Sequence, residues 1–122
     1  MNIFLINHYA GSPRHGMEFR PYYFAREWVR AGHNVTIIGS SFSHLRSTQP
    51  ICDNPVSFEE IDGIRYIWFR APSYSGNSYR RIVNMLLFSM QLFSRDICTG
   101  NPDVVIDSST YPLTIWGSRK IA

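Results

Sequence analysis

Residues 11–18 have part of the pattern of a phosphate-binding loop. Residues 11–16, with the sequence GSPRHG, have the glycine spacing of a P-loop. Met17 and Glu18 stand where that loop requires Lys and Ser or Thr to hold phosphate and magnesium, so the sequence argues against an ATPase. No G-x-G-x-x-G motif follows the apolar run at residues 2–7. Gly39-Ser40, at the end of the apolar run at residues 33–39, stands where a dinucleotide-binding protein has an acidic residue that binds the ribose. A dinucleotide-dependent enzyme is therefore not predicted.

The histidines, cysteines and serines show no spacing that defines a metal site or a catalytic site. The histidines have no paired metal-ligand spacing: His8, His15, His33 and His44. His8 directly follows the apolar run at residues 2–7. A structural role and a contact with a ligand are equally consistent with this position. Cys52 and Cys98 lie in unrelated contexts, which favours reduced cytosolic thiols. No serine-centred nucleophile elbow is present, so the sequence names neither a metal site nor a covalent nucleophile.

Composition sets the class of protein. The chain has 122 residues, enough for one domain with one core, and its 44% hydrophobic and 17% charged residues are typical of a globular protein. The net charge of +3 permits a phosphate-bearing ligand or an anionic membrane surface without requiring either. Lys120 is the only lysine, so nearly all the positive charge is arginine, which suits planar recognition of phosphate or carboxylate but is also common on solvated helix faces.

The N-terminal third predicts a strand, a long loop, a helix and a second strand. Residues 2–7 are an apolar run without alternation, which is typical of a strand buried on both faces. Residues 19–31 have helical periodicity and end at Gly32, a favoured helix C′ residue, and residues 33–39 form a β-branched strand. The loop at residues 8–18 exceeds the roughly 2–6 residues usual for such connections, and long loops after a first strand commonly bind a ligand.

The rest of the chain continues the alternation of strands and helices. Asp62-Gly63 predicts a hairpin between residues 58–61 and 64–69. Residues 79–97 predict a core helix, with a buried row of Ile82, Leu86, Met90, Phe93 and Ile97. Its apolar run falls far short of the roughly 20 residues of a membrane span, and contact with a membrane surface, suggested by Arg80 and Arg81, is the less favoured alternative.

The last predicted elements place a ligand site at one point of the sheet. Residues 103–106 form a buried strand, and Pro112 begins a helix that still has apolar residues to bury at Ala122, so the sheet is expected to be incomplete. This alternation predicts an α/β fold with a Rossmann-like, doubly wound, mostly parallel sheet carrying a β-hairpin, in the order three-two-one-four with the strand at Ile64 outermost. Ligands bind outside the carboxyl ends of strands where such an order reverses, here between residues 8–18 and 107–112.

Six segments of the sequence resemble a known family of enzymes. Residues 8–13 (HYAGSP), residues 16–23 (GMEFRPYY) and residues 30–36 (RAGHNVT) are similar to the opening of bacterial GT-B sugar transferases of the retaining family 4 type. Three further segments extend the resemblance over nearly the whole chain: 41–46 (SFSHLR), 61–64 (IDGI) and 102–106 (PDVVI). The closest similarity is to the O-antigen and capsule subgroup that includes N-acetyl-L-fucosamine transferases.

The resemblance implies an activity and a location. It implies a metal-independent, cofactor-free glycosyltransferase that moves a sugar from a nucleotide-sugar donor, with retention, to a lipid-linked saccharide acceptor during lipopolysaccharide or other surface polysaccharide synthesis. The protein would be cytoplasmic, without a nucleic-acid partner, and in peripheral contact with the inner membrane. Residues 1–122 would be the incomplete N-terminal, acceptor-side domain, and without the C-terminal donor-binding domain the chain alone would be inactive.

The resemblance also suggests substrate-binding residues, each with a structural alternative. Residues 11–18 would approach the donor diphosphate with the backbone amides of Gly16 and Met17, while Glu18 would orient sugar hydroxyls or simply stabilise the helix start. Arg20 would meet phosphate or be a solvated first-turn residue. The candidate residues are therefore His8, Gly11, Gly16, Met17, Glu18 and Arg20, together with Ser108, Ser109 and Thr110, which would line the acceptor side or act as helix caps.

A function of a different class stays open from the sequence. A free-standing α/β module that binds a phosphorylated ligand or a protein partner, without catalysis, would have the same strand pattern and the same loop positions. Catalytic residues are not predicted for either function.

Overall fold

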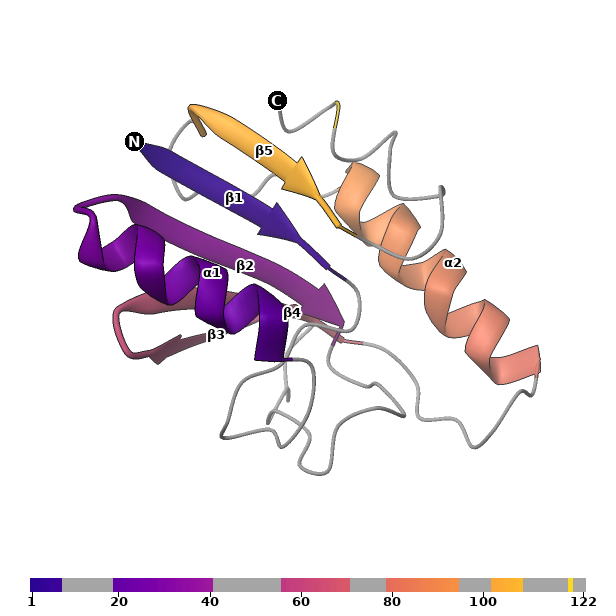
Figure 1. The fold of residues 1–122 in the computed structure, drawn as a ribbon. Coiled ribbons are helices and arrows are strands. Elements are labelled where there is room, and N and C mark those ends of the chain that lie inside the picture. The colour runs from indigo at the N-terminus through magenta and orange to yellow at the C-terminus, as the bar shows by residue number, and fades with distance from the viewer. Residues whose placement is uncertain (8–18, 41–55, 71–78, 95–101, 109–118, 120–122) are drawn as a thin grey trace.

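Seven helices and strands make up the part of the chain that the computed structural model describes, residues 1–7, 19–40, 56–70, 79–94, 102–108 and 119 (Figure 1). In chain order they are β1 (Asn2–Ile6), α1 (Phe19–Arg30), β2 (Asn34–Ser40), β3 (Val56–Ile61), β4 (Ile64–Phe69), α2 (Tyr79–Ser94) and β5 (Val104–Asp107). Within these residues, no helix is both long enough and apolar enough to cross a membrane.

The strands form one mixed sheet in the order β3-β4-β2-β1-β5. β1 pairs in parallel with β2 and with β5, and β2 pairs in parallel with β4. The fold is therefore α/β with a mostly parallel sheet and two helices, and its strand order is compatible with a Rossmann-like fold. The predicted position of the last strand beside β1 is confirmed. The strand at Ile64 is the outermost of the parallel strands, as predicted, and the first arm of the predicted hairpin, the antiparallel β3, forms the sheet edge beside it.

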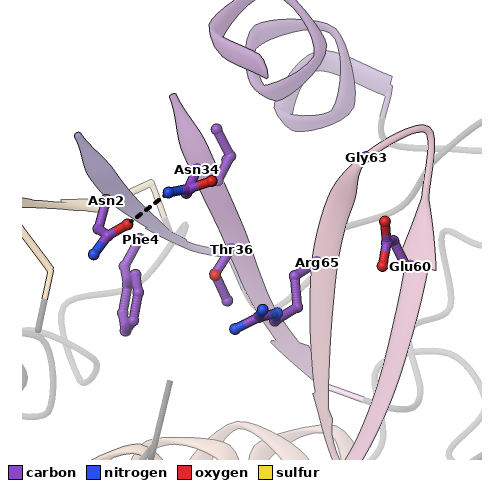
Figure 2. Close-up of a pocket in the computed structure, with 8 residues that line it drawn as sticks. Asn2, Phe4, Asn34, Thr36, Glu60, Gly63 and Arg65 are labelled. Carbon is purple, nitrogen blue, oxygen red and sulfur yellow. Dashed lines mark hydrogen bonds between the residues drawn. The ribbon is translucent and has the colours of Figure 1, made fainter. Parts of the chain in front are cut away.

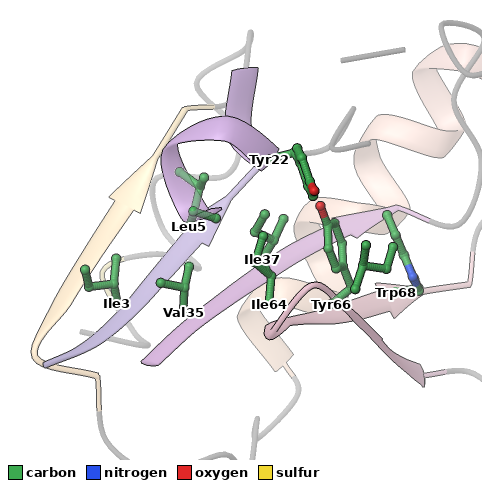
Figure 3. Packing of buried hydrophobic residues seen from close by; sticks show 10 residues of the cluster. Ile3, Leu5, Tyr22, Val35, Ile37, Ile64, Tyr66 and Trp68 are labelled. Carbon is green, nitrogen blue, oxygen red and sulfur yellow. The ribbon is translucent and has the colours of Figure 1, made fainter. Parts of the chain in front are cut away.

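The continuous apolar runs bury side chains on both faces of the sheet, as predicted for strands between two helices. Alternate residues of β1 and β2 face opposite sides, so Leu5 and Ile37 pack with Tyr22 and Ala25 of α1, while Ile6 and Ile38 pack with Phe88 of α2. Figure 3 shows the cluster on the α1 side, which also includes Tyr66 and Trp68 of β4. The two clusters hold one helix on each side of the sheet.

Positive backbone angles occur at the two turns where the sequence predicts them. Gly32 has φ +93°, its N–H donates to the Val29 carbonyl at 3.0 Å, and the N–H of His33 donates to the Trp28 carbonyl at 3.0 Å. These bonds are a Schellman motif, so the predicted glycine C-cap is confirmed. In the β3–β4 hairpin Asp62 and Gly63 have φ values of 52° and 80°, as a type I′ turn requires.

The predicted buried row of α2 is wrong in the structure. Ile82, Leu86 and Met90 are 60%, 44% and 65% exposed, and the fully buried side chains are Asn84 and Phe88. Phe93 and Ile97 are not among the residues whose side chains the structure describes. Because α2 is apolar around most of its circumference, spacing alone does not decide which row faces the sheet. The choice follows from Phe88, whose ring lies 5.8 Å from that of Phe69, and from Asn84, which accepts a hydrogen bond from Ser40 Oγ at 3.3 Å.

Candidate functional site

The structure brings two of the predicted site residues to one pocket. Arg20, in the first turn of α1, and Ser108, directly after β5, both line a cavity of about 230 Å³ that we call the α1–β5 pocket. This pocket adjoins the pair β1–β5, where the strand order reverses. Of the two loops predicted to line a site there, residues 8–18 and 107–112, only Asp107 and Ser108 lie within the described residues. The other predicted site residues lie outside the described residues, so their positions stay predictions: His8, Gly11, Gly16, Met17, Glu18, Ser109 and Thr110.

The α1–β5 pocket is mostly apolar, with its polar groups contributed by Arg20 and Ser108. The strands supply Leu5 and Ile106, and the helix supplies Pro21, Phe24 and Trp28. The rings of Phe24 and Trp28 are stacked, with centroids 5.9 Å apart and planes inclined by 17°. Sequence reasoning missed these two aromatic residues as site residues, although their spacing of four, on a helix that follows the long predicted loop, was a usable signal.

The polar groups of the α1–β5 pocket differ in how they are held. The Ser108 N–H donates to the Ile6 carbonyl at 2.9 Å, and its hydroxyl lies 3.4 Å from the same oxygen, so the backbone fixes its place at the carboxyl end of β1. Arg20 is exposed, and no carboxylate among the described residues forms an ion pair with it. The first turn of α1 contains no acidic residue, so nothing in that turn offsets the positive end of the helix dipole. Among the described residues, Arg20 and the first turn of α1 therefore carry positive charge without a carboxylate beside them.

Tyr22 lies next to Arg20 and Pro21 on α1 but serves a different contact. Its hydroxyl donates a hydrogen bond to the Asp62 carboxylate in the β3–β4 turn. This hydrogen bond, followed by burial, raises the pKa of Tyr22 above its usual value of 10.0. The guanidinium of Arg26 lies over the Tyr23 ring at 4.8 Å and more distantly over Tyr22. Together these contacts fix the first half of α1, and with it the α1 side of the pocket.

A second pocket opens at the opposite end of the strands. This amino-edge pocket has a volume of about 350 Å³ and lies among Asn2, Phe4, Asn34, Thr36 and Arg65 (Figure 2). Asn34 Nδ2 donates to Asn2 Oδ1 at 3.2 Å across its rim. Sequence reasoning did not predict this pocket. The signal was Thr36 and Arg65, two polar residues in register on neighbouring apolar strands.

Comparisons of the chain with protein-family models, with curated proteins and with solved structures gave no match. Within the residues that the structure describes, His, Cys, Asp and Glu form no group of three or more placed to hold a metal ion. The geometry of the α1–β5 pocket is therefore the observation that bears on function.

Proposed function

We propose that the chain is the N-terminal, acceptor-side domain of a retaining glycosyltransferase with a GT-B fold. In this proposal the mostly parallel sheet is the first part of a doubly wound Rossmann-like domain, and the complete cytoplasmic enzyme carries a second domain that binds a nucleotide-sugar donor. The acceptor is a lipid-linked saccharide used for surface polysaccharides. The observation that carries the proposal is the α1–β5 pocket, because it joins two predicted site residues at the point where the strand order reverses.

The chemistry of the α1–β5 pocket suits an acceptor that has both apolar and anionic parts. Phe24 and Trp28 offer ring faces against which the C–H face of a sugar or a lipid chain packs. Arg20 and the N-terminal end of α1 lie where they favour a phosphate group, and the Ser108 hydroxyl offers a further polar contact. A saccharide carried on a lipid diphosphate combines these features in one molecule.

The proposal is tested by anion binding at the two ends of the strands. Inorganic pyrophosphate, a probe for the diphosphate of the lipid-linked acceptor, is titrated into the 15N-labelled chain, and backbone shifts are followed for wild type, Arg20→Gln and Arg65→Gln. Arg65 is the matched control because it is also exposed but lines the amino-edge pocket. We expect Arg20→Gln to weaken binding about tenfold, the usual loss for one charge-assisted hydrogen bond. Arg65→Gln should bind like wild type.

The opposite pattern contradicts the proposal. If Arg65→Gln abolishes binding and Arg20→Gln does not, the anion site lies at the amino edge, where ligands of open α/β sheets do not bind. The chain would then fit the non-catalytic binding module better than the transferase domain.

A further inference from the structure

The strand β3 forms one edge of the sheet, and β4 is its partner among the described strands (Figure 1). Ile61 and Ile64 flank the two-residue type I′ turn, so they exchange both backbone hydrogen bonds. In an antiparallel ladder this exchange recurs at every second residue, so the backbone groups of Ser57 and Glu59 also point toward β4. The backbone N–H and C=O groups of the alternate residues therefore point away from the sheet: Val56, Phe58 and Glu60.

Phe58 lies at the centre of this outward row. Its side chain is 66% exposed, whereas the other aromatic side chains of the described strands are buried: Phe4, Tyr66, Trp68 and Phe69. Edge strands are commonly protected from pairing by a charged residue or a proline. In β3 the carboxylate of Glu59 lies on the α1 side, where it accepts a hydrogen bond from Trp68 Nε1 at 3.3 Å, and Glu60 lies next to the turn. The middle of this edge is therefore apolar.

The β3 edge, as we call Val56, Phe58 and Glu60 with their outward backbone groups, also has space beside it. A hollow of about 430 Å³ is lined by Phe58, Glu59, Glu60 and Arg65. Successive side chains of a strand point to opposite faces of the sheet, so a hollow lined by both Glu59 and Glu60 reaches around the edge of β3. The hollow gives room for the side chains of an added strand.

We propose that two copies of the chain pair antiparallel through the β3 edge, with Phe58 opposite Phe58 of the second copy. Because Phe58 is the midpoint of the outward row, a two-fold axis through this pair places Val56 opposite Glu60 and leaves no outward N–H or C=O of the row unmatched. The two rings form an aromatic cross-strand pair, and no two charges of like sign lie directly opposite each other. An unrelated strand would need matching side chains of its own, whereas the β3 edge is complementary to itself.

A contact limited to one strand buries less than the roughly 800 Å² per partner of a stable interface, so we expect a dissociation constant on the order of 100 µM. This inference does not rest on the proposed function. β3 and β5 are opposite edges of the sheet, and the α1–β5 pocket shares no residue with the β3 edge. Either proposal therefore stands if the other fails.

Sedimentation velocity of the 122-residue chain measures this pairing, at concentrations from about 10 µM to about 1 mM. We expect the average mass of wild type to rise toward that of a dimer. Phe58→Lys and Phe58→Glu each place like charges opposite one another and remove the aromatic pair, so each should raise the dissociation constant at least about tenfold. An equimolar mixture of the two variants should restore the dimer, because the lysine then lies opposite the glutamate.

The matched control is Ile82→Lys, which changes an apolar side chain that is 60% exposed on α2 and should leave dimerisation as in wild type. Far-UV circular dichroism checks that every variant is folded. A wild type that stays monomeric at the highest concentration overturns the proposal, as does a dimer that survives in Phe58→Lys, whether or not Ile82→Lys disrupts it. A mixture of Phe58→Lys and Phe58→Glu that stays monomeric also overturns it, because the two positions then do not face each other.

Discussion

The hydroxyl of Tyr22 joins α1 to the β3–β4 turn, and this bond makes stability depend on alkaline pH. In the unfolded chain Tyr22 loses its proton near pH 10.0, whereas in the folded chain the bond to Asp62 holds the proton to higher pH. The stabilising contribution is therefore fully present below pH 10.0 and is lost as pH rises through the folded pKa. We expect Tyr22→Phe to lower the free energy of unfolding by about 1 kcal/mol near pH 8 and by clearly less near pH 11.

Urea unfolding at the two pH values measures this difference. Tyr79→Phe, at a side chain that is 72% exposed, is the control and should leave the urea midpoint unchanged. A Tyr22→Phe deficit of equal size at both pH values would show that the hydroxyl stabilises through packing alone.

Two glycines with positive φ differ in what surrounds them. A Cβ on Gly63 would lie 3.2 Å from Val29 Cγ1, whereas a Cβ on Gly32 would meet nothing within 4 Å. Gly32→Ala should cost only the backbone strain, about 1 kcal/mol, and Gly63→Ala should cost more because Val29 must also shift. Chemical denaturation of both variants checks this order. Equal losses of unfolding free energy in the two variants would mean that Val29 shifts away from the new methyl group at no cost.

At the level of elements, one aromatic ring makes the fully buried apolar contact between α2 and the sheet, among the α2 side chains that the structure describes. Phe88 is fully buried in the cluster with Ile6, Ile38 and Phe69, while Leu86 on the same helix is 44% exposed. We expect Phe88→Ala to lower the free energy of unfolding by about 3–5 kcal/mol and Leu86→Ala by less than about 1 kcal/mol. Thermal unfolding of both variants gives the comparison, and similar losses would indicate that Leu86 packs inward as its spacing first suggested.

The strands were more predictable than the helix faces, for a physical reason. A run such as residues 2–7 is buried on both sides, so no choice of face is needed, and the Asp62-Gly63 turn fixes its own hairpin register. In α2 two apolar rows compete, and the contacts that decide between them come from Ser40 and Phe69, distant in sequence. The sequence predicted the strand order, and with it a site beside β1 and β5, but the aromatic wall of the α1–β5 pocket depends on the tertiary packing of α1.

At the level of the whole molecule, we expect the 122-residue chain alone to transfer no sugar. Retaining transfer requires a donor held so that its leaving diphosphate is stabilised beside the acceptor. In the proposed enzyme the donor is held by a second domain. Purified chain is incubated with a panel of nucleotide sugars and lipid-linked acceptors, beside the complete two-domain enzyme. Turnover by the chain at the rate of the complete enzyme would contradict the proposed division of roles.

β5 joins the sheet from far along the chain. The Asn2 N–H that donates to Asp103 Oδ2 at 2.7 Å belongs to a residue 101 positions earlier. Contacts among β1, α1 and β2 close over short stretches, so loop-closure entropy favours their forming first. Because Ile106 and Ser108 are part of the α1–β5 pocket, the pocket forms only after this distant pairing. On the ribosome, the chain would thus pair β1, β2, β3 and β4 in a sheet before the α1–β5 pocket exists. The pocket, with the acceptor site proposed for it, would form only once residues past 108 have left the exit tunnel.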